Sequence, residues 1–133
     1  MKVALAVLAD AANVTADGKL NILGVFDRFA SERFPAAIPR ATLVIKFEGD
    51  AADQGRTKKL EIQLWDADGH QVVGLESDVE IPADAGIRPS FNNVLVMNGL
   101  GFPHPGRYAF HILINGQTEE RVELEAELIA PPA

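Results

Sequence analysis

Apolar and polar side chains alternate in two neighbouring stretches within residues 105–128, near the end of the chain. The apolar residues that share a parity are Tyr108, Phe110, Ile112 and Ile114 in the first stretch and Val122, Leu124, Ala126 and Leu128 in the second. Successive side chains of an extended strand point to opposite faces. The pattern therefore predicts two half-buried strands joined as a hairpin, with one face closing a core.

The same parity constrains the turn of this hairpin. A two-residue Asn-Gly loop would place Tyr108 opposite Glu123, an apolar residue against a charged one. A three-residue loop of residues 114–116, with Gly116 at positive φ, instead pairs Tyr108 with Val122. We therefore expect the three-residue loop.

The rest of the chain predicts further short strands separated by turn signals. They are expected at residues 3–8, 19–29, 42–48, 60–65, 73–81 and 91–100. The 19–29 strand is expected to be central or to contain a bulge near Gly24, because its apolar residues point to both faces. The link at 31–40 contains Pro35 and Pro39 and is expected to cross between sheets.

These elements predict an all-β chain: an antiparallel two-sheet sandwich of about eight strands, Ig-like or fibronectin-like, with a closed barrel as the alternative. No helical period interrupts the pattern. The corner before Tyr108 supports the sandwich, because a tyrosine at this position can bond the backbone upstream.

Length and composition limit the possible classes of protein. The chain has 133 residues, 47% of them hydrophobic, and no cysteine. We expect a single domain over residues 1–133, free of disulfides and cytoplasmic. The opening residues imitate a signal peptide, but the apolar run passes directly into a strand pattern. No stretch approaches the roughly 20 apolar residues of a membrane span.

The net charge of -7 disfavours negatively charged partners. Binding to phosphate chains or anionic membranes depends on clustered Lys and Arg, and only Arg56, Lys58 and Lys59 cluster here. We therefore expect no nucleic acid and no membrane as partners. The expected partner is a protein, including a second copy of the chain.

Several segments resemble a family of small, mostly bacterial proteins of unknown function. They are Leu-Ala-Asp at 8–10, Asp-Gly-Lys-Leu-Asn-Ile-Leu-Gly-Val-Phe-Asp-Arg at 17–28, the link with Pro35 and Pro39, and Pro-Gly-Arg-Tyr-Ala-Phe-His-Ile-Leu-Ile-Asn-Gly at 105–116. The resemblance implies a stand-alone β-sandwich domain without a signal peptide. It brings no catalytic or ligand-binding residues.

Motifs for chemistry are scarce in this sequence. Phosphate-binding loops, zinc-protease patterns and serine nucleophile elbows are missing, so we expect no enzyme, no catalytic residue and no cofactor. If consecutive strands alternate in direction, three connections emerge at the same end of the molecule. Asp66, Asp68, His70 and His104 gather there, and two imidazoles with two carboxylates are ligands for a divalent metal such as zinc. The third histidine, His111, is expected to be a strand residue beside Glu119.

Some apolar residues have the parity opposite to the expected core and are candidates for an interface. Those selected are Trp65, Val44 and Met97, and they predict a homo-oligomer. The leading hypothesis is a non-catalytic interaction or structural module that acts through a sheet face or a loop end. The alternatives are a carbohydrate or small-ligand binding module that uses Trp65, and a metal-dependent enzyme that uses the His70/His104 end.

Overall fold

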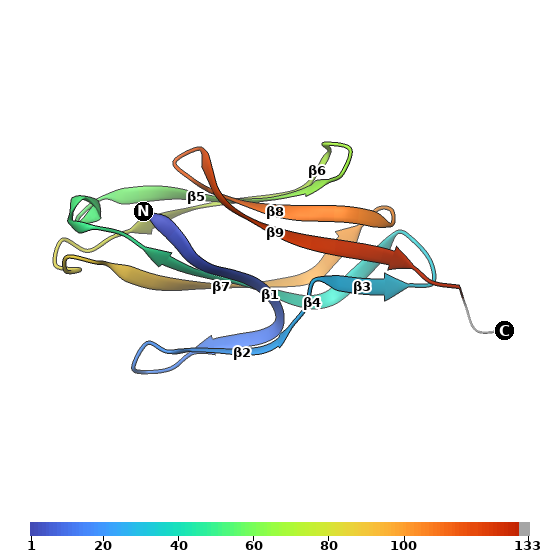
Figure 1. Cartoon of the computed structure of the whole chain (residues 1–133), viewed down its shortest axis with the longest axis horizontal. Helices are drawn as coiled ribbons and strands as arrows, with labels where there is room; N and C mark the ends of the chain where they lie inside the picture. Colours follow the sequence, from blue (N-terminus) through green and yellow to red (C-terminus); the bar gives the residue numbers. More distant parts are fainter. Residues whose placement is uncertain (131–133) are drawn as a thin grey trace.

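In a computed structural model, which describes residues 1–130, nine strands and one short 3-10 helix follow one another along the chain (Figure 1). The elements are β1 (Lys2–Val14), β2 (Leu20–Val25), β3 (Arg28–Ser31), β4 (Ala36–Glu48), η1 (Ala51–Asp53), β5 (Thr57–Asp66), β6 (Gln71–Glu80), β7 (Ser90–Phe102), β8 (Gly106–Ile114) and β9 (Gln117–Leu128). Sheet A has the strand order β2-β1-β4-β7, and sheet B has the order β3-β9-β8-β5-β6. The predicted all-β chain with two sheets is confirmed, with nine strands in place of about eight.

The extra strand comes from residues 19–29, where one strand was predicted. The chain crosses between the sheets at Phe26 and Asp27: Phe26 N–H donates to the Leu8 carbonyl in sheet A, and Asp27 accepts from Glu125 N–H in sheet B. This stretch is therefore β2 and β3, each at the edge of a different sheet. Because β3 runs parallel to β9, sheet B is not wholly antiparallel. The predicted crossing between sheets is confirmed, since the chain passes here from β3 in sheet B to β4 in sheet A. The link is shorter than the expected 31–40, because β4 begins at Ala36 and includes Pro39.

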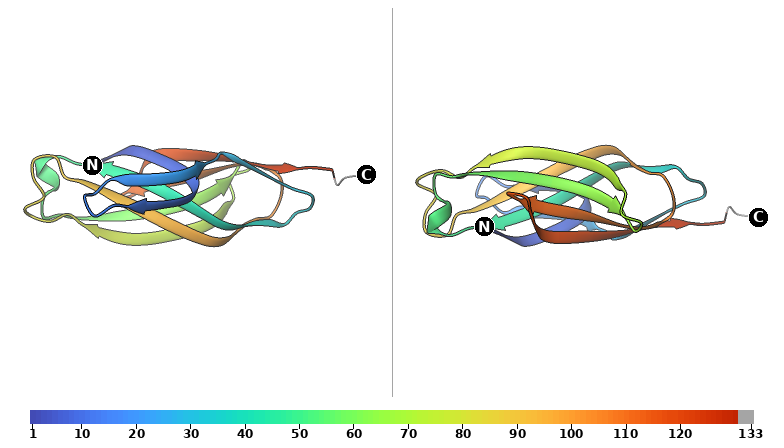
Figure 2. Two further views of the ribbon diagram at one scale, coloured as in Figure 1. Left: turned by 90° about the horizontal axis from the view of Figure 1, so that it is seen from below. Right: turned by 90° about the horizontal axis from the view of Figure 1, so that it is seen from above.

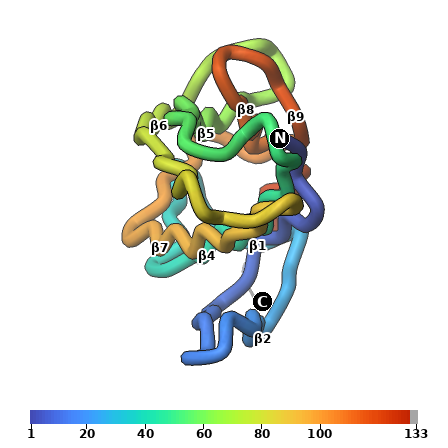
Figure 3. The backbone as a smooth tube through the Cα atoms, turned by 90° about the vertical axis from the view of Figure 1, so that its left-hand side faces the viewer, coloured from blue at the N-terminus to red at the C-terminus, as the bar shows by residue number. Residues whose placement is uncertain are grey.

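The core lies between the two sheets. Sheet B curls over sheet A when the molecule is viewed along its length (Figure 3), and the strands run lengthwise in both sheets (Figure 2). The largest fully buried side chains are Leu8, Leu43, Ile45, Phe47 and Phe102 from sheet A and Leu64, Tyr108, Phe110, Ile112 and Leu124 from sheet B. Burial of such side chains contributes roughly 1.5–3 kcal/mol each. The apolar face of the β8–β9 hairpin, which was predicted to close a core, is therefore buried against sheet A.

The turn of the β8–β9 hairpin differs from the prediction. Ile114 pairs with Gln117, so the loop contains only Asn115 and Gly116, both at positive φ. The register then shifts by one residue at Glu119, which is left out of the ladder as a β-bulge. Asn115 also donates from N–H to the Lys59 carbonyl and accepts from Lys59 N–H through its side chain, which favours the tight turn.

The bulge restores the parity that a two-residue loop alone would break. Tyr108 pairs with Leu124, not with Val122, and Phe110 pairs with Val122. The apolar residues of both arms therefore share the core face, as predicted. A two-residue loop with a bulge achieves this, in place of the expected three-residue loop. Leu128 is an exception, with 59% of its surface exposed. It extends beyond Ala126, the last residue of β9 that faces β8.

β2 and the part of β1 that pairs with it bend away from β4 and β7 and form a partial third layer on the outer side of sheet A (Figures 1 and 3). Two contacts attach it: Thr42 Oγ1 lies 3.4 Å from the Asp10 carbonyl oxygen, and Asn92 Nδ2 lies 3.4 Å from the Gly18 carbonyl oxygen. Val44, on the outer side of β4, is 0% exposed and does not belong to the core cluster. The hairpin therefore covers apolar residues that strand alternation assigns to the solvent side.

The tyrosine corner predicted at the start of β8 is present. Tyr108 Oη donates to the carbonyl of His104 and lies 3.3 Å from His104 N. The ring itself is buried against Phe102, with ring centroids 4.9 Å apart. This contact fixes the connection between β7 and β8 against the end of the core.

Candidate functional site

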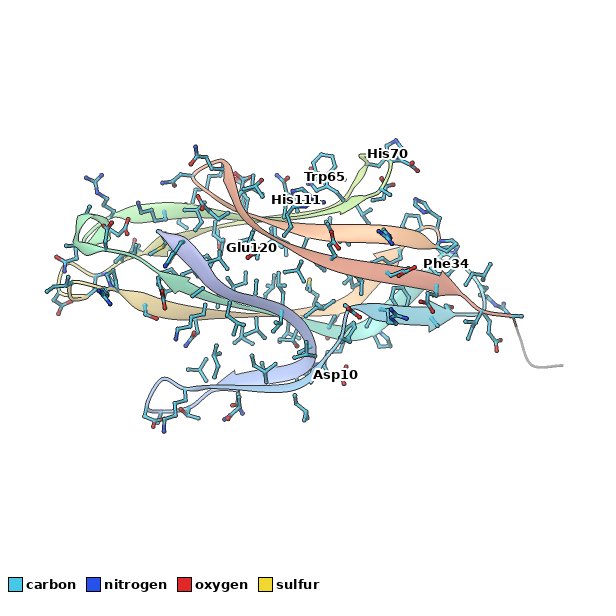
Figure 4. All side chains as sticks on the ribbon, viewed as in Figure 1. Asp10, Phe34, Trp65, His70, His111 and Glu120 are labelled. Atoms are coloured by element: carbon cyan, nitrogen blue, oxygen red, sulfur yellow. The ribbon has the colours of Figure 1, made fainter. Side chains whose placement is uncertain are left out.

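A hollow of about 380 Å³ lies on the outer face of sheet B, on the side away from sheet A. Figure 4 shows Trp65 and His111 projecting together from this outer face. The residues that line the hollow include Asp27, Arg28, Trp65, Asp66, Arg107, Ala109, His111, Arg121, Glu123 and Glu125. Most of them stand on β5, β8 and β9, so paired strands hold the hollow in shape.

The register of the three strands explains the depression. Ala109 on β8 pairs with Trp65 on β5 and with Glu123 on β9. A methyl group therefore lies between two long side chains, which leaves space above it. In the next row, His111 pairs with Gln63 and Arg121. His111, which we expected beside Glu119, thus lies opposite Arg121 because the bulge shifts the register.

Trp65 and His111 form the aromatic wall of the hollow. Both side chains are half-buried, and their ring centroids are 6.4 Å apart with an interplanar angle of 62°. Trp65 Nε1 donates to Gln63 Oε1 at 3.0 Å, which fixes the indole orientation. Burial lowers the pKa of His111, and the neighbouring Arg121 guanidinium lowers it further. The wall at neutral pH is therefore an indole beside an uncharged imidazole.

Charged side chains of both signs surround this wall. Arg107 pairs with Glu125 across the ladder, and Arg28 on β3 flanks Glu125 on the other side. The Arg28 guanidinium lies 3.5 Å from a Glu127 carboxylate oxygen. Within residues 1–130, Arg107 and Arg121 form no ion pair. Their donors remain available to a bound polar group.

The four predicted metal ligands gather at the end of the hollow. Asp66, Asp68 and His70 lie in the β5–β6 turn, and their ligand atoms are within 4.8 Å of one another. His104 approaches from the β7–β8 connection, with Nε2 3.2 Å from Asp66 Oδ2. The structure therefore brings together two connections predicted to share one end of the molecule.

Hydrogen bonding determines the charge of this cluster. The backbone N–H of His70 and the His104 side chain hold the pKa of Asp66 below its usual range. A hydrogen bond to the Pro105 carbonyl and the contact with Asp66 raise the pKa of His104. When His104 is protonated, its Nε2–H donates to Asp66 Oδ2 and the two groups form a charge-assisted pair.

The three predicted interface residues have different surroundings. Trp65 lines the hollow and is accessible there. Val44 and Met97 are buried, so the prediction that they form an interface is wrong. The β1–β2 hairpin covers Val44. Met97 belongs to the core because it has the parity of Leu95 and pairs with the buried Ala41. The inward side of β7 changes after it, near Gly99 at positive φ, so that Leu100 also points inward.

Sequence reasoning missed the charged residues of the hollow. Arg107, Arg121 and Glu123 alternate with core residues, which assigns them to the outer face. The alternation therefore indicated that these three residues lie on the outer face. It could not indicate the depression at Ala109, because the positions of Trp65 and Glu123 beside it depend on the register of three strands.

Comparisons with known proteins give a family and a fold. The model of a family of unknown function (DUF6941) matches residues 4–127. No curated protein matches the sequence significantly. A solved structure of the Pseudomonas fluorescens alkylpurine DNA glycosylase AlkC, bound to DNA containing an abasic site analog, is similar with a TM-score of 0.51 and 14% identity. The likeness covers 75% of this chain and 27% of that one, and it shows the fold alone.

One expectation about partners is changed by these findings. The prediction of no nucleic-acid partner is corrected, because this fold occurs in a protein whose structure contains bound DNA. Net charge alone therefore does not exclude nucleic acid. Among residues 1–130, no helix is long and apolar enough to cross a membrane.

Proposed function

This chain belongs to DUF6941, a family of unknown function, and from its geometry we propose that it is a non-catalytic, Ig-like module that binds a small ligand on the outer face of sheet B. The hollow beside Trp65 carries this proposal. Its volume of about 380 Å³ falls in the range of small-molecule sites, roughly 300–1,000 Å³. Most of its residues stand on paired strands, so little ordering cost is expected on binding.

The chemistry of the hollow favours a hydroxyl-rich ligand of the carbohydrate class. An indole offers a flat apolar surface, and a sugar ring presents C–H groups that can lie against it. Arg107 and Arg121 supply donors, and Glu123 supplies an acceptor, around the same space. This combination of one aromatic surface and several fixed polar groups is typical of a site that orients a small polar molecule.

The test is an array of immobilised oligosaccharides, probed with labelled protein, followed by titration of Trp65 fluorescence with any sugar that is retained. Trp65 is the single tryptophan of the chain, so its emission reports the site directly. We expect Trp65→Ala to abolish retention and Arg107→Ala to weaken it. Leu75→Ala, on the outlying strand β6, is the matched control and retains binding. The proposal fails if no sugar is retained or if Trp65→Ala binds normally.

A second candidate function is self-association through β2. This strand is at the edge of sheet A, and Leu23 and Val25 on it are 71% and 61% exposed. An exposed edge with apolar side chains is a template for pairing with another strand. We propose a homo-oligomer that uses this edge, in place of the surface expected at Val44 and Met97.

A further inference from the structure

Two connections carry four side chains with metal-ligating atoms to the end of sheet B. Asp66, Asp68 and His70 come from the β5–β6 turn, and His104 comes from the β7–β8 connection. Residues distant in sequence thus converge on one carboxylate oxygen, Asp66 Oδ2. This arrangement adjoins the hollow beside Trp65, which Asp66 also lines, but its ligand atoms are suited to a metal ion and not to a sugar.

Asp66 is held in the geometry of a monodentate ligand. Its side chain is 3% exposed. Oδ1 accepts hydrogen bonds from the backbone N–H groups of Asp68 and His70, at 2.9 and 2.8 Å. Oδ2 faces the two imidazoles, 3.3 Å from His70 Nδ1 and 3.2 Å from His104 Nε2. The backbone therefore occupies one oxygen and presents the other.

His104 is oriented in the way that metal-binding histidines usually are. Its Nδ1 lies 3.1 Å from the Pro105 carbonyl oxygen, a distance at which Nδ1–H donates. Nε2 is then the nitrogen that faces Asp66 Oδ2: it donates to Asp66 when the ring is protonated and becomes a ligand atom once a metal ion displaces that proton. The ring stacks on Tyr108 with centroids 5.6 Å apart, and Tyr108 Oη holds the His104 carbonyl. Tyr108 therefore holds both the imidazole ring and the backbone of His104 in place.

Two separations, both to Asp66 Oδ2, are close to the ligand-to-ligand spacing of a zinc coordination sphere. Zinc binds nitrogen and carboxylate oxygen at about 2.0–2.2 Å, so two ligand atoms of a tetrahedron are about 3.3–3.6 Å apart. The separations of 3.3 and 3.2 Å are close to this edge length, and the ligand atoms of Asp66, Asp68 and His70 lie within 4.8 Å of one another. We infer that Asp66 Oδ2, His70 Nδ1, His104 Nε2 and the Asp68 carboxylate form a binding site for one zinc-class divalent ion.

The ligand set determines the class of metal. Two imidazoles with two carboxylates suit zinc and related transition ions, whereas magnesium and calcium prefer all-oxygen sites. His70 is 79% exposed and Asp68 is exposed, so the ion can enter from solvent without opening the core. Binding would join the β5–β6 turn to the β7–β8 connection through a common ion.

The experiment is isothermal titration of the full chain, without an affinity tag, with zinc chloride. The variants are His70→Ala and the double variant His70→Ala/His104→Ala. His111→Ala is the matched control, because the chain has three histidines and His111 stands outside the cluster. We expect one zinc per chain in the wild type. Each ligand loss should weaken binding at least about tenfold, since losing even an outer partner typically costs 10–100-fold. His111→Ala should bind like the wild type.

A second readout separates a metal site from a hydrogen-bonded cluster. Cobalt in a tetrahedral site of this type absorbs visible light strongly, and we expect that absorption in the wild type and not in the double variant. No binding of zinc by the wild type, or undiminished binding by the double variant, overturns the inference. If the double variant does not fold, the zinc affinity of His70→Ala provides the test, because this exposed side chain contributes little to the core. Undiminished affinity in that variant also overturns the inference.

Discussion

Tyr108 connects the core to the β7–β8 connection that carries His104. Its ring packs on Phe102, while its hydroxyl bonds the backbone of His104. A single side chain thus contributes to packing and fixes a loop. Its burial raises the pKa of Tyr108, so the phenol stays protonated and able to donate.

Replacing Tyr108 with phenylalanine separates these contributions. The ring stays, but the half-buried His104 carbonyl loses its donor. We expect Tyr108→Phe to lower the free energy of unfolding by about 0.5–1.5 kcal/mol with an unchanged denaturant slope. Urea unfolding followed by circular dichroism measures this. An unchanged midpoint would show that the hydroxyl contributes nothing to the corner.

Asp53 is a buried carboxylate at the opposite end of the molecule. It accepts from Asp50 N–H at 2.8 Å and lies 2.9 Å from Lys58 Nζ. The backbone bond and the Lys58 ammonium lower the pKa of Asp53 from 3.8 to about 2. Because the unfolded state binds the proton more tightly, the stabilisation is fully present above about pH 4 and is lost as the pH falls towards 2.

The variant Asp53→Asn removes the charge that titrates. At neutral pH we expect it to be less stable than the wild type by about 1–3 kcal/mol, since Lys58 and the Asp50 amide lose their charged partner. Between about pH 4 and pH 2, its stability should fall less than that of the wild type. Urea midpoints across this range measure the difference. Parallel pH curves for the two proteins would contradict the assignment.

The β8–β9 hairpin shows how one extra residue sets the face of a whole strand. A two-residue turn at Asn115 and Gly116 would turn Leu124 and Ala126 outward, and the bulge at Glu119 turns them back. Both residues are almost fully buried. The bulge therefore keeps the apolar face of β9 in the core.

Deleting Glu119 tests this role. With the tight turn retained, the inward residues of β9 would face solvent, and we expect a loss of more than about 3 kcal/mol or failure to fold. The matched control is Glu119→Ala, which keeps the residue count and should change stability by less than about 0.5 kcal/mol. Thermal unfolding compares the two. A deletion variant as stable as the substitution would contradict the role of the bulge.

The alternation of apolar and polar residues predicted strands correctly where one face of the strand meets the core. From the sequence alone it assigned Tyr108, Phe110 and Leu124 to one face, and all three are buried. It could not locate the bulge, because residues 117–121 are all exposed and polar and carry no alternation. The end of the molecule that collects Asp66 and His104 followed from strand direction alone, whereas their contact depended on side-chain geometry.

At the scale of the molecule, the β1–β2 hairpin changes which surfaces are available. It covers Val44, which local alternation assigned to the surface, and exposes its own outer side chains. No local pattern indicates that a hairpin will fold over a neighbouring sheet. The candidate surface for self-association therefore moved from the face of sheet A to the edge at β2.

Self-association through this edge makes a specific prediction. We expect the wild type to show a concentration-dependent dimer in sedimentation velocity and Leu23→Asp/Val25→Asp to remain a monomer, because charges on an edge strand oppose pairing. Leu75→Asp, an exposed leucine on β6 at the edge of sheet B, is the control and should leave the dimer intact. A wild type that is monomeric at all concentrations would rule out this interface.

The ligand hollow on sheet B is the central claim, and amide NMR of the labelled chain with a retained oligosaccharide tests it most directly. We predict that the shifts concentrate on β5, β8 and β9, around Trp65, Ala109 and Glu123. The β1–β2 hairpin, on the far side of sheet A, should be unaffected. Shifts confined to that hairpin, or no shifts at saturating sugar, would contradict the assignment of the ligand site.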